Sequence, residues 1–281
     1  DEIGKDARSY KPYNGKDFGL YSDNQVMKNF KSMGYKIVNF NTFSLHFHEL
    51  PLADLSVCHK TSNIMDNRLL DTVGRSTMIG YFIERWSENE DRQVILCTFE
   101  ELPKVNESFD EPVFVWAHIM LPHPPLIFGP NGEAVTPGKP LLIMNHPDFR
   151  NSGWDIKQQF VQQLQFTNKK SMEFIDKVLD DGKPSIIIIQ GDHGSGFNIN
   201  WQDPTDDNVI QRLSTFNAIY FPDEEHKEII TDDQTLVNTF RIVFNSYFGS
   251  DYEILEDKMY WGYNEKPYMF KDVTSILLEK P

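Results

Sequence analysis

The chain has 281 residues, of which 40% are apolar and 25% charged, and its formal net charge is −15. With 13% aromatic residues it has ample material for a packed core, which excludes disorder throughout as a class. The excess of acidic side chains argues against nucleic acid as a partner and against a polybasic membrane-binding surface, because both need positive charge. No stretch approaches about 18 consecutive apolar residues, so the sequence predicts no membrane span.

Hydrophobic periodicity, together with the residues that begin and end helices, predicts alternating helices and strands. Residues 1–21 are polar without a clear period, and we expect an irregular lead-in there. Residues 92–102 fit either a helix or a strand. In chain order the predictions are a helix at 22–33, a strand at 35–40, a helix at 64–86, a strand at 112–118, a helix at 152–179, strands at 185–190 and 215–221, and a helix at 233–247.

Single residues mark several helix ends. Ser22 or Asp23 can cap the first helix, and Gly34 suits the position after its last turn. Asp206 and Asp207 are typical of a solvated face or of a helix N-terminus.

Two apolar runs, PVFVWAH at 112–118 and SIIIIQ at 185–190, are typical of strands buried on both faces. The helix between them makes a strand–helix–strand unit, in which the two strands are expected to be parallel. We therefore predict an α/β fold, in which residues 22–281 form one domain with a mostly parallel central sheet and helices on both faces.

Cys58 and Cys97 are the only cysteines, which excludes a disulfide-rich scaffold and a zinc site built from CxxC pairs. One disulfide and two buried free thiols stay open as alternatives. The chain starts at Asp1 without a signal segment, so we expect a piece of a longer protein.

Ligands of open parallel sheets bind beyond the carboxyl ends of the strands, so the residues after each strand are candidates for a site. Asp192 and His193 directly follow SIIIIQ, and glycines on both sides let the two side chains converge. An Asp oxygen and a His nitrogen suit Zn²⁺ or Mn²⁺, and fit Ca²⁺ less well because of the imidazole. The alternative is a capping Asp and a surface His in a glycine-rich turn.

Two histidines follow the other buried strand: His118 ends it, and His123 lies in the sequence LPHPP. Prolines stiffen that segment, which belongs to a long loop at 119–150, and long loops in compact domains are usually functional. The alternatives are a solvated loop histidine for His123 and a hydrogen-bonded core histidine for His118.

A rival metal site is His46 with His48, which would share one face of a strand. The acidic and final His of a complete HxHxDH pattern are missing, so a half-exposed strand is the preferred interpretation. Thr61 and Ser62 lack the context of a nucleophile. The sequence has no GxSxG elbow, P-loop or HExxH motif.

Four segments taken together, FVWAHIMLPHPP, QQLQFTNKKSMEFIDKVL, IIIIQGDHGSG and FNAIYFP, resemble the sulfatase-like branch of the alkaline phosphatase superfamily. The resemblance runs from about residue 22 to the C-terminus and is closest to the membrane-anchored group of lipoteichoic acid synthase and phosphoethanolamine or phosphoglycerol transferases. It implies a three-layer α/β/α fold and a metal-dependent hydrolase or phosphotransferase that acts on a sulfate or phosphate ester through a covalent intermediate.

By this resemblance, Asp192 and His193 bind one divalent metal (Zn, Mn or Ca), His123 contacts the sulfate or phosphate group, and His118 lies nearby. The family's first strand, with an acidic ligand, and its nucleophile helix do not fit within residues 1–21. We therefore expect both, with a membrane anchor, upstream of Asp1, and we expect this chain alone to be inactive.

The resemblance further implies an extracytoplasmic location, at the periplasm or cell surface, and a small-molecule, lipid or glycan ester as substrate. Sulfate and phosphate, and hydrolysis and transfer, stay open. The alternative functions are a relative that binds a ligand or partner without catalysis, and an unrelated α/β metalloprotein built on His46 and His48.

Overall fold

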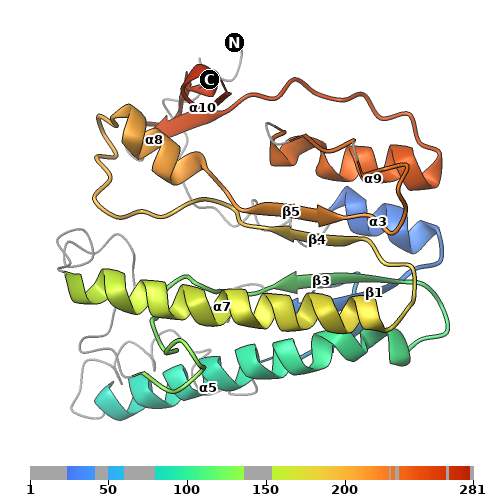
Figure 1. Cartoon of the computed structure of the whole chain (residues 1–281), viewed down its shortest axis with the longest axis horizontal. Helices are drawn as coiled ribbons and strands as arrows, with labels where there is room; N and C mark the ends of the chain where they lie inside the picture. The colour runs from blue at the N-terminus through green and yellow to red at the C-terminus, as the bar shows by residue number, and fades with distance from the viewer. Residues whose placement is uncertain are drawn as a thin grey trace. The chain divides into compact units, whose positions relative to one another are not determined.

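The computed structural model describes residues 24–41, 50–59, 80–135, 154–227, 229–231, 234–263 and 266–278. The chain divides into a first unit, residues 15–181, and a second unit, residues 182–281 with 1–14, and each is described by itself (Figure 1). The elements of the first unit are α3 (Gln25–Ser32), β1 (Lys36–Asn41), β2 (Leu55–Val57), α5 (Gly80–Glu101), η1 (Leu102–Glu107), β3 (Val113–His118) and α7 (Trp154–Asp180). Those of the second are β4 (Ile187–Gln190), α8 (Asp206–Leu213), β5 (Asn217–Tyr220), η2 (Leu236–Asn238), α9 (Thr239–Phe248), β6 (Tyr260–Tyr263), β7 (Lys266–Asp272) and α10 (Thr274–Leu278).

The first unit is built on a parallel three-stranded sheet in the order β2-β1-β3. On one face α3 packs against the sheet, where the ring of Phe30 stacks on Phe114 with centroids 4.5 Å apart. On the other face Val38 and Phe40 pack against η1 and against Phe174 of α7. Helices α5 and α7 lie side by side (Figure 1). The described part of this unit is therefore α/β, with helical elements on both faces of the sheet.

Cys58 and Cys97 form a disulfide with their Cα atoms 5.7 Å apart, so of the two open alternatives the structure has the bond. It joins the residue after β2 to α5. Because Cys58 packs against the core that contains Val38 and Phe40, the bond fastens α5 beside the sheet.

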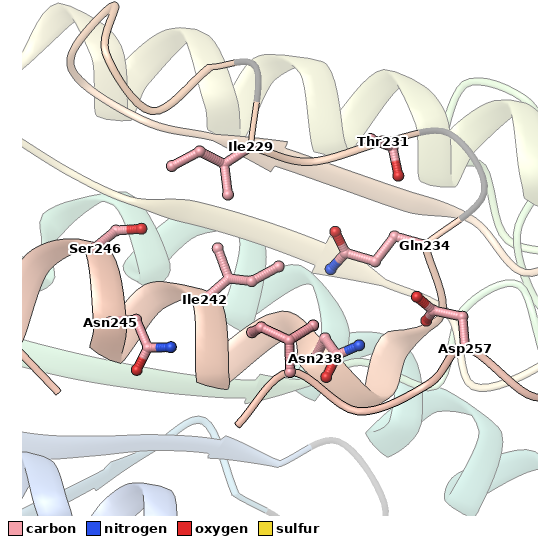
Figure 2. A pocket seen from close by; sticks show the side chains of 9 residues that line it. Ile229, Thr231, Gln234, Asn238, Ile242, Asn245, Ser246 and Asp257 are labelled. Atoms are coloured by element: carbon pink, nitrogen blue, oxygen red, sulfur yellow. The ribbon is translucent and has the colours of Figure 1, made fainter. Parts of the chain in front are cut away.

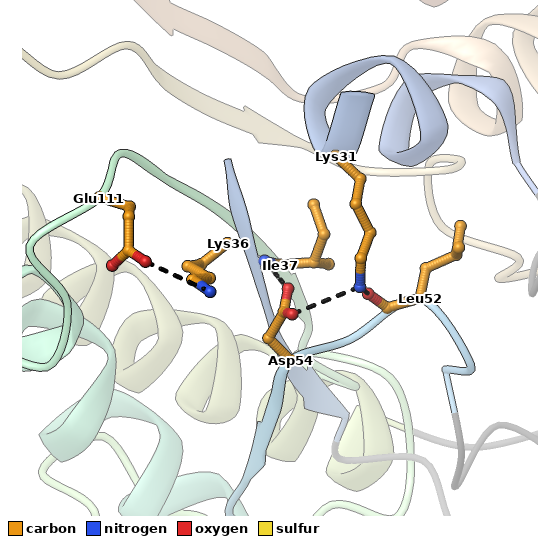
Figure 3. A network of polar contacts seen from close by, with 6 residues as sticks. All are labelled: Lys31, Lys36, Ile37, Leu52, Asp54 and Glu111. Atoms are coloured by element: carbon orange, nitrogen blue, oxygen red, sulfur yellow. Dashed lines mark hydrogen bonds and ion pairs between the residues drawn. The ribbon is translucent and has the colours of Figure 1, made fainter. Parts of the chain in front are cut away.

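Asp54, just before β2, connects three elements of the first unit (Figure 3). Its carboxylate accepts a hydrogen bond of 2.8 Å from the Ile37 backbone N–H and lies 3.4 Å from the Lys31 ammonium. Burial opposes ionisation of this group, but the hydrogen bond from Ile37 and the charge of Lys31 outweigh it, so the pKa of Asp54 is lowered. The carboxylate thus holds α3, β1 and β2 together.

The second unit has two antiparallel strand pairs, β4 with β5 and β6 with β7. Phe221, Ile242 and Val243 form a core in which α9 packs with the apolar residues of β4 and β5. Ile199 and Val209 belong to a separate core that also holds residues of β6 and α10, together with Val273, which follows β7. This unit is therefore a mixture of short helices and antiparallel pairs.

All four predicted strands are present, as β1, β3, β4 and β5. The predicted helices correspond to α3, α5, α7 and α9, with α5 described from residue 80 onward and continuing through the ambiguous residues 92–101. The cap of α3 is Asn24, whose side chain accepts from the Met27 N–H, and not Ser22 or Asp23. Asp206 and Asp207 open α8, as one of their two interpretations predicted. The patterns missed β2, α8 as a whole, β6, β7 and α10.

The predicted parallel pairing of strands 112–118 and 185–190 needs correction. β3 pairs with β1, whereas β4 belongs to another sheet and pairs antiparallel with β5. The crossover rule constrains only strands of one sheet, and periodicity does not reveal which strands share a sheet. A hydrogen bond from the Gly191 N–H to the Phe216 carbonyl extends the β4–β5 ladder by one residue. The predictions for residues 1–21, for His46 with His48 and for Thr61 with Ser62 lie outside the described residues.

Candidate active site

Asp192 and His193 come directly after β4 and are brought together by the structure. The Nε2 atom of His193 lies 3.4 Å from Oδ2 of Asp192. The Asp192 side chain is 86% exposed, and that of His193 is 29% exposed. His193 Nδ1 lies 2.9 Å from the Gly194 carbonyl oxygen, to which only a protonated nitrogen can donate. In the neutral ring the lone pair is therefore on Nε2, beside the carboxylate.

This pair fits two ligands of a divalent metal. Tetrahedral coordination with bonds of about 2.1 Å separates two ligand atoms by roughly 3.4 Å, and the observed separation of Nε2 from Oδ2 is 3.4 Å. Metal-binding histidines commonly donate their other N–H to a carbonyl, as His193 does to Gly194. Within the described residues no group of three or more His, Cys, Asp or Glu side chains forms a metal cluster, so the pair supplies two of the ligands that a metal needs.

The end of α8 holds the backbone that carries this pair. The Gly194 N–H donates to the Arg212 carbonyl at 2.7 Å, and Arg212 Nη1 donates back to the Gly194 carbonyl at 3.1 Å. Gln211 Nε2 donates to Ser195 Oγ at 2.7 Å and to the Phe197 carbonyl at 2.9 Å. A Cβ atom on Gly194 would lie 2.1 Å from the Gln211 carbonyl oxygen. Only glycine therefore allows this close approach of loop and helix.

Arg212 is a half-buried cation beside the pair. Burial lowers the pKa of its guanidinium, and the nearby charge of Asp192 partly offsets that effect. The guanidinium also stands over the ring of Trp201, 5.2 Å from its centroid. Arg212 thus contacts both the Gly194 carbonyl of the loop and the ring of Trp201.

His118 is the last residue of β3, in the first unit. Strand alternation places it on the same face as Phe114, the face on which α3 packs. The β1 residue Asn39 shares that face, since it is in register with Trp116. The Oδ1 atom of Asn39 is buried and has no hydrogen-bond partner in the part of the chain that the structure describes. His118 therefore stands at the carboxyl end of the parallel sheet, as predicted for a site residue.

His123 lies in the loop after β3, and its Nδ1 is 2.5 Å from the Pro124 carbonyl oxygen. The residues that follow, Leu126, Ile127 and Phe128, are at most 1% exposed, so the loop carries its own core. That core includes Phe166 of α7, whose ring stacks on Phe128. His123, itself partly buried, is thus joined to a buried segment.

Two helices supply the polar groups that hold this loop. From α5, Arg92 donates to the Ile127 carbonyl at 2.6 Å and to the Gly132 carbonyl at 3.0 Å, and its guanidinium lies 4.4 Å from the Phe128 ring centroid. Burial lowers the pKa of Arg92. From α7, Gln163 is fully buried and bonds the backbone on both sides of His123.

Sequence reasoning missed the residues that hold both loops, namely Gln163, Arg92, Gln211 and Arg212. One signal was present: Gln163 is three residues after Phe160 and three before Phe166, on the apolar face of a predicted helix. A polar residue at such a position must find a buried partner.

The second unit has another Asp–His pair, which differs in chemistry. His226 Nδ1 lies 2.5 Å from Asp223 Oδ1, and Tyr247 donates its hydroxyl to the other carboxylate oxygen. The Tyr247 hydrogen bond, followed by that from His226, lowers the pKa of Asp223, and burial with the bond to Asp223 raises that of Tyr247. Both carboxylate oxygens are therefore occupied within the protein, unlike those of the 86% exposed Asp192.

The same unit contains a cavity of about 340 Å³ between the residues around Ile229 and helix α9 (Figure 2). Gln234 and Asp257 point toward it. Asp257 is bound by the N–H and hydroxyl of Thr235. Neither Asp192 nor His193 lines this cavity, which is therefore separate from the Asp192–His193 pair.

Fold and site together define an α/β protein with an exposed Asp–His pair at the end of a strand. His118 and His123 belong to the first unit, whereas Asp192 and His193 belong to the second. None of the described helices combines the length and apolarity needed to cross a membrane. No family model, curated protein or solved structure matches the chain.

Proposed function

We propose that the chain is the domain of a metal-dependent hydrolase or phosphotransferase that acts on sulfate or phosphate esters. It would belong to the sulfatase-like branch of the alkaline phosphatase superfamily, with the corresponding three-layer fold. The observation that carries the proposal is the pair of Asp192 and His193, whose facing atoms are 3.4 Å apart. The proposal includes an extracytoplasmic, membrane-anchored parent protein and a small-molecule, lipid or glycan ester as substrate.

The residues of this chain have distinct tasks in the proposal. Asp192 offers a carboxylate oxygen, and His193 offers Nε2 while its Nδ1–H stays on the Gly194 carbonyl. A divalent metal bound there would act as a Lewis acid toward an ester oxygen. His123 keeps Nδ1 on the Pro124 carbonyl, and in its protonated form it donates Nε2–H to an anionic oxygen of the substrate.

Calorimetric titration of Zn²⁺ and Mn²⁺ into the full chain tests the metal half of the proposal. Asp192→Asn and His193→Gln should each weaken binding roughly tenfold or more, because each removes one of the metal's ligands. The matched controls are Asp223→Asn and His226→Gln in the other pair, which should leave the affinity unchanged. Equal affinity of wild type and the Asp192 and His193 variants would contradict the proposal, as would a loss confined to the controls.

The anion half is tested by titrating inorganic phosphate and sulfate into the metal-loaded chain. His123→Ala should weaken anion binding roughly tenfold, since a hydrogen bond to a charged group is lost. The preference between the two anions then indicates whether the substrate is a phosphate or a sulfate ester. Anion binding that survives in His123→Ala would contradict the role of this histidine.

A further inference from the structure

Gln163 lies in α7, is 0% exposed, and uses its whole carboxamide on the loop after β3. Its Oε1 accepts from the backbone N–H groups of Ile127 and Phe128, at 2.9 and 3.2 Å. Its Nε2 lies 3.1, 3.1 and 3.3 Å from three backbone carbonyl oxygens, those of Pro122, His123 and Pro125.

The composition of the loop explains why one amide is needed there. Prolines at 122, 124 and 125 have no backbone N–H, so this segment cannot join a sheet and satisfy its carbonyls in a ladder. Buried carbonyls without partners are costly, and the two N–H donors of one primary amide meet three of them. His123 is the middle one of the three residues whose carbonyls are bound.

We infer that Gln163 is the positioning residue of His123, and this inference rests on the proposed role of His123 in anion binding. Gln163 contacts the loop backbone before, at and after the histidine, and so sets the point from which the imidazole projects. It acts through His123, and its substitution alters anion binding without removing a group assigned to the anion. The sulfate or phosphate group is then recognised by an imidazole whose place is determined by α7.

The alternative is that Gln163 only fills space. Gln163→Glu keeps the size and the acceptor atoms but replaces the donor with an oxygen that faces three carbonyl oxygens. Gln163→Met keeps a similar volume and removes both kinds of hydrogen bond. If Gln163 only filled space, Gln163→Met would be tolerated, whereas a positioning role predicts that both variants displace His123. The matched control is Gln165→Glu, an exposed glutamine on the same helix with the same change of charge.

The experiment is NMR of the ¹⁵N-labelled full chain, with the ring signals of His123 assigned through His123→Ala. Gln163→Glu and Gln163→Met should shift the His123 ring signals and weaken phosphate binding roughly fivefold to tenfold, while the His193 signals stay in place. Gln165→Glu should change neither quantity. Wild-type His123 signals and phosphate affinity in both Gln163 variants would overturn the inference.

A measurement on the wild type covers the case in which the variants do not fold. The side-chain amide protons of Gln163 should exchange with solvent far more slowly than those of Gln165 and show contacts with the His123 backbone. Exchange as fast as that of Gln165 would overturn the inference. If the wild type binds no phosphate, the proposed anion role of His123 fails, but the ring signals and the exchange rates still decide the positioning.

Discussion

The loop after β3 carries His123, and the loop after β4 carries Asp192 and His193; each loop is held by a glutamine and an arginine from helices. The loop after β3 is bonded by Gln163 and Arg92, and its central residues are buried. The loop after β4 is bonded by Gln211 and Arg212, and its Asp192 side chain is 86% exposed. The backbone of the first loop is therefore bonded within a buried environment, whereas the second loop exposes a carboxylate to solvent.

The largest expected effect tests the packing of the first loop. Phe166→Ala should lower the free energy of unfolding by about 3–5 kcal/mol, because it deletes a buried ring. That ring stacks on Phe128 at a centroid distance of 4.4 Å. Urea denaturation measures the change. Met172→Ala, at a 60% exposed position of the same helix, should change stability by less than about 0.5 kcal/mol. Similar losses of stability in both variants would show that the Phe166 ring does not stabilise the first loop.

The disulfide belongs to the first unit. Breaking it should lower the free energy of unfolding nearly as much as Phe166→Ala does. Reduction of the Cys58–Cys97 bond, which closes a loop with a sequence separation of 39, should cost about 2–4 kcal/mol because it frees the unfolded chain. Thermal melting with and without reductant measures this. The double variant Cys58→Ser/Cys97→Ser should melt at the lowered temperature and should not respond to reductant. A wild type that ignores reductant would contradict the prediction.

Gly194→Ala tests the close approach in the second loop. Its Cβ would meet the Gln211 carbonyl oxygen at 2.1 Å, and two backbones would have to separate. The expected loss is about 1–3 kcal/mol in urea denaturation, with weaker Zn²⁺ binding since His193 donates to the same residue. In the control Gly191→Ala the nearest atom is 3.7 Å away, so little change is expected. Equal effects of the two substitutions would show that α8 does not fix this loop.

The smallest expected effect on stability is that of Asp54→Asn, a substitution outside both loops. The pKa of Asp54 is lowered in the folded chain, so its stabilisation is present above the unfolded pKa and is lost as the pH falls through the folded value. Asp54→Asn should cost about 0.5–1 kcal/mol at pH 7, and the difference from wild type should shrink as the pH falls below the unfolded pKa of about 3.9. Urea denaturation at several pH values measures it, with exposed Asp110→Asn as control. A difference that grows in acid would reverse the assigned sign.

Local patterns predicted the elements of the fold well because they depend on neighbouring residues. The apolar runs that become β3 and β4 and the long periodic helix α7 could be recognised without any tertiary information. The short strand β2 could not, since three residues carry too little pattern. The pair β6–β7 was also missed. The candidate ligands Asp192 and His193 could be found because they are adjacent in the chain and follow a strong strand signal.

The sequence by itself determined where the strands and helices with a strong apolar pattern form, and which residues follow the ends of the buried strands. Only the tertiary structure decided that β4 pairs antiparallel with β5, that Cys58 bonds to Cys97, and that Gln163 holds the loop of His123. The physical reason is distance along the chain. Periodicity reports which face of a segment is buried. The partner that covers that face, 27 to 41 residues away in these cases, is chosen by the packing of the whole unit.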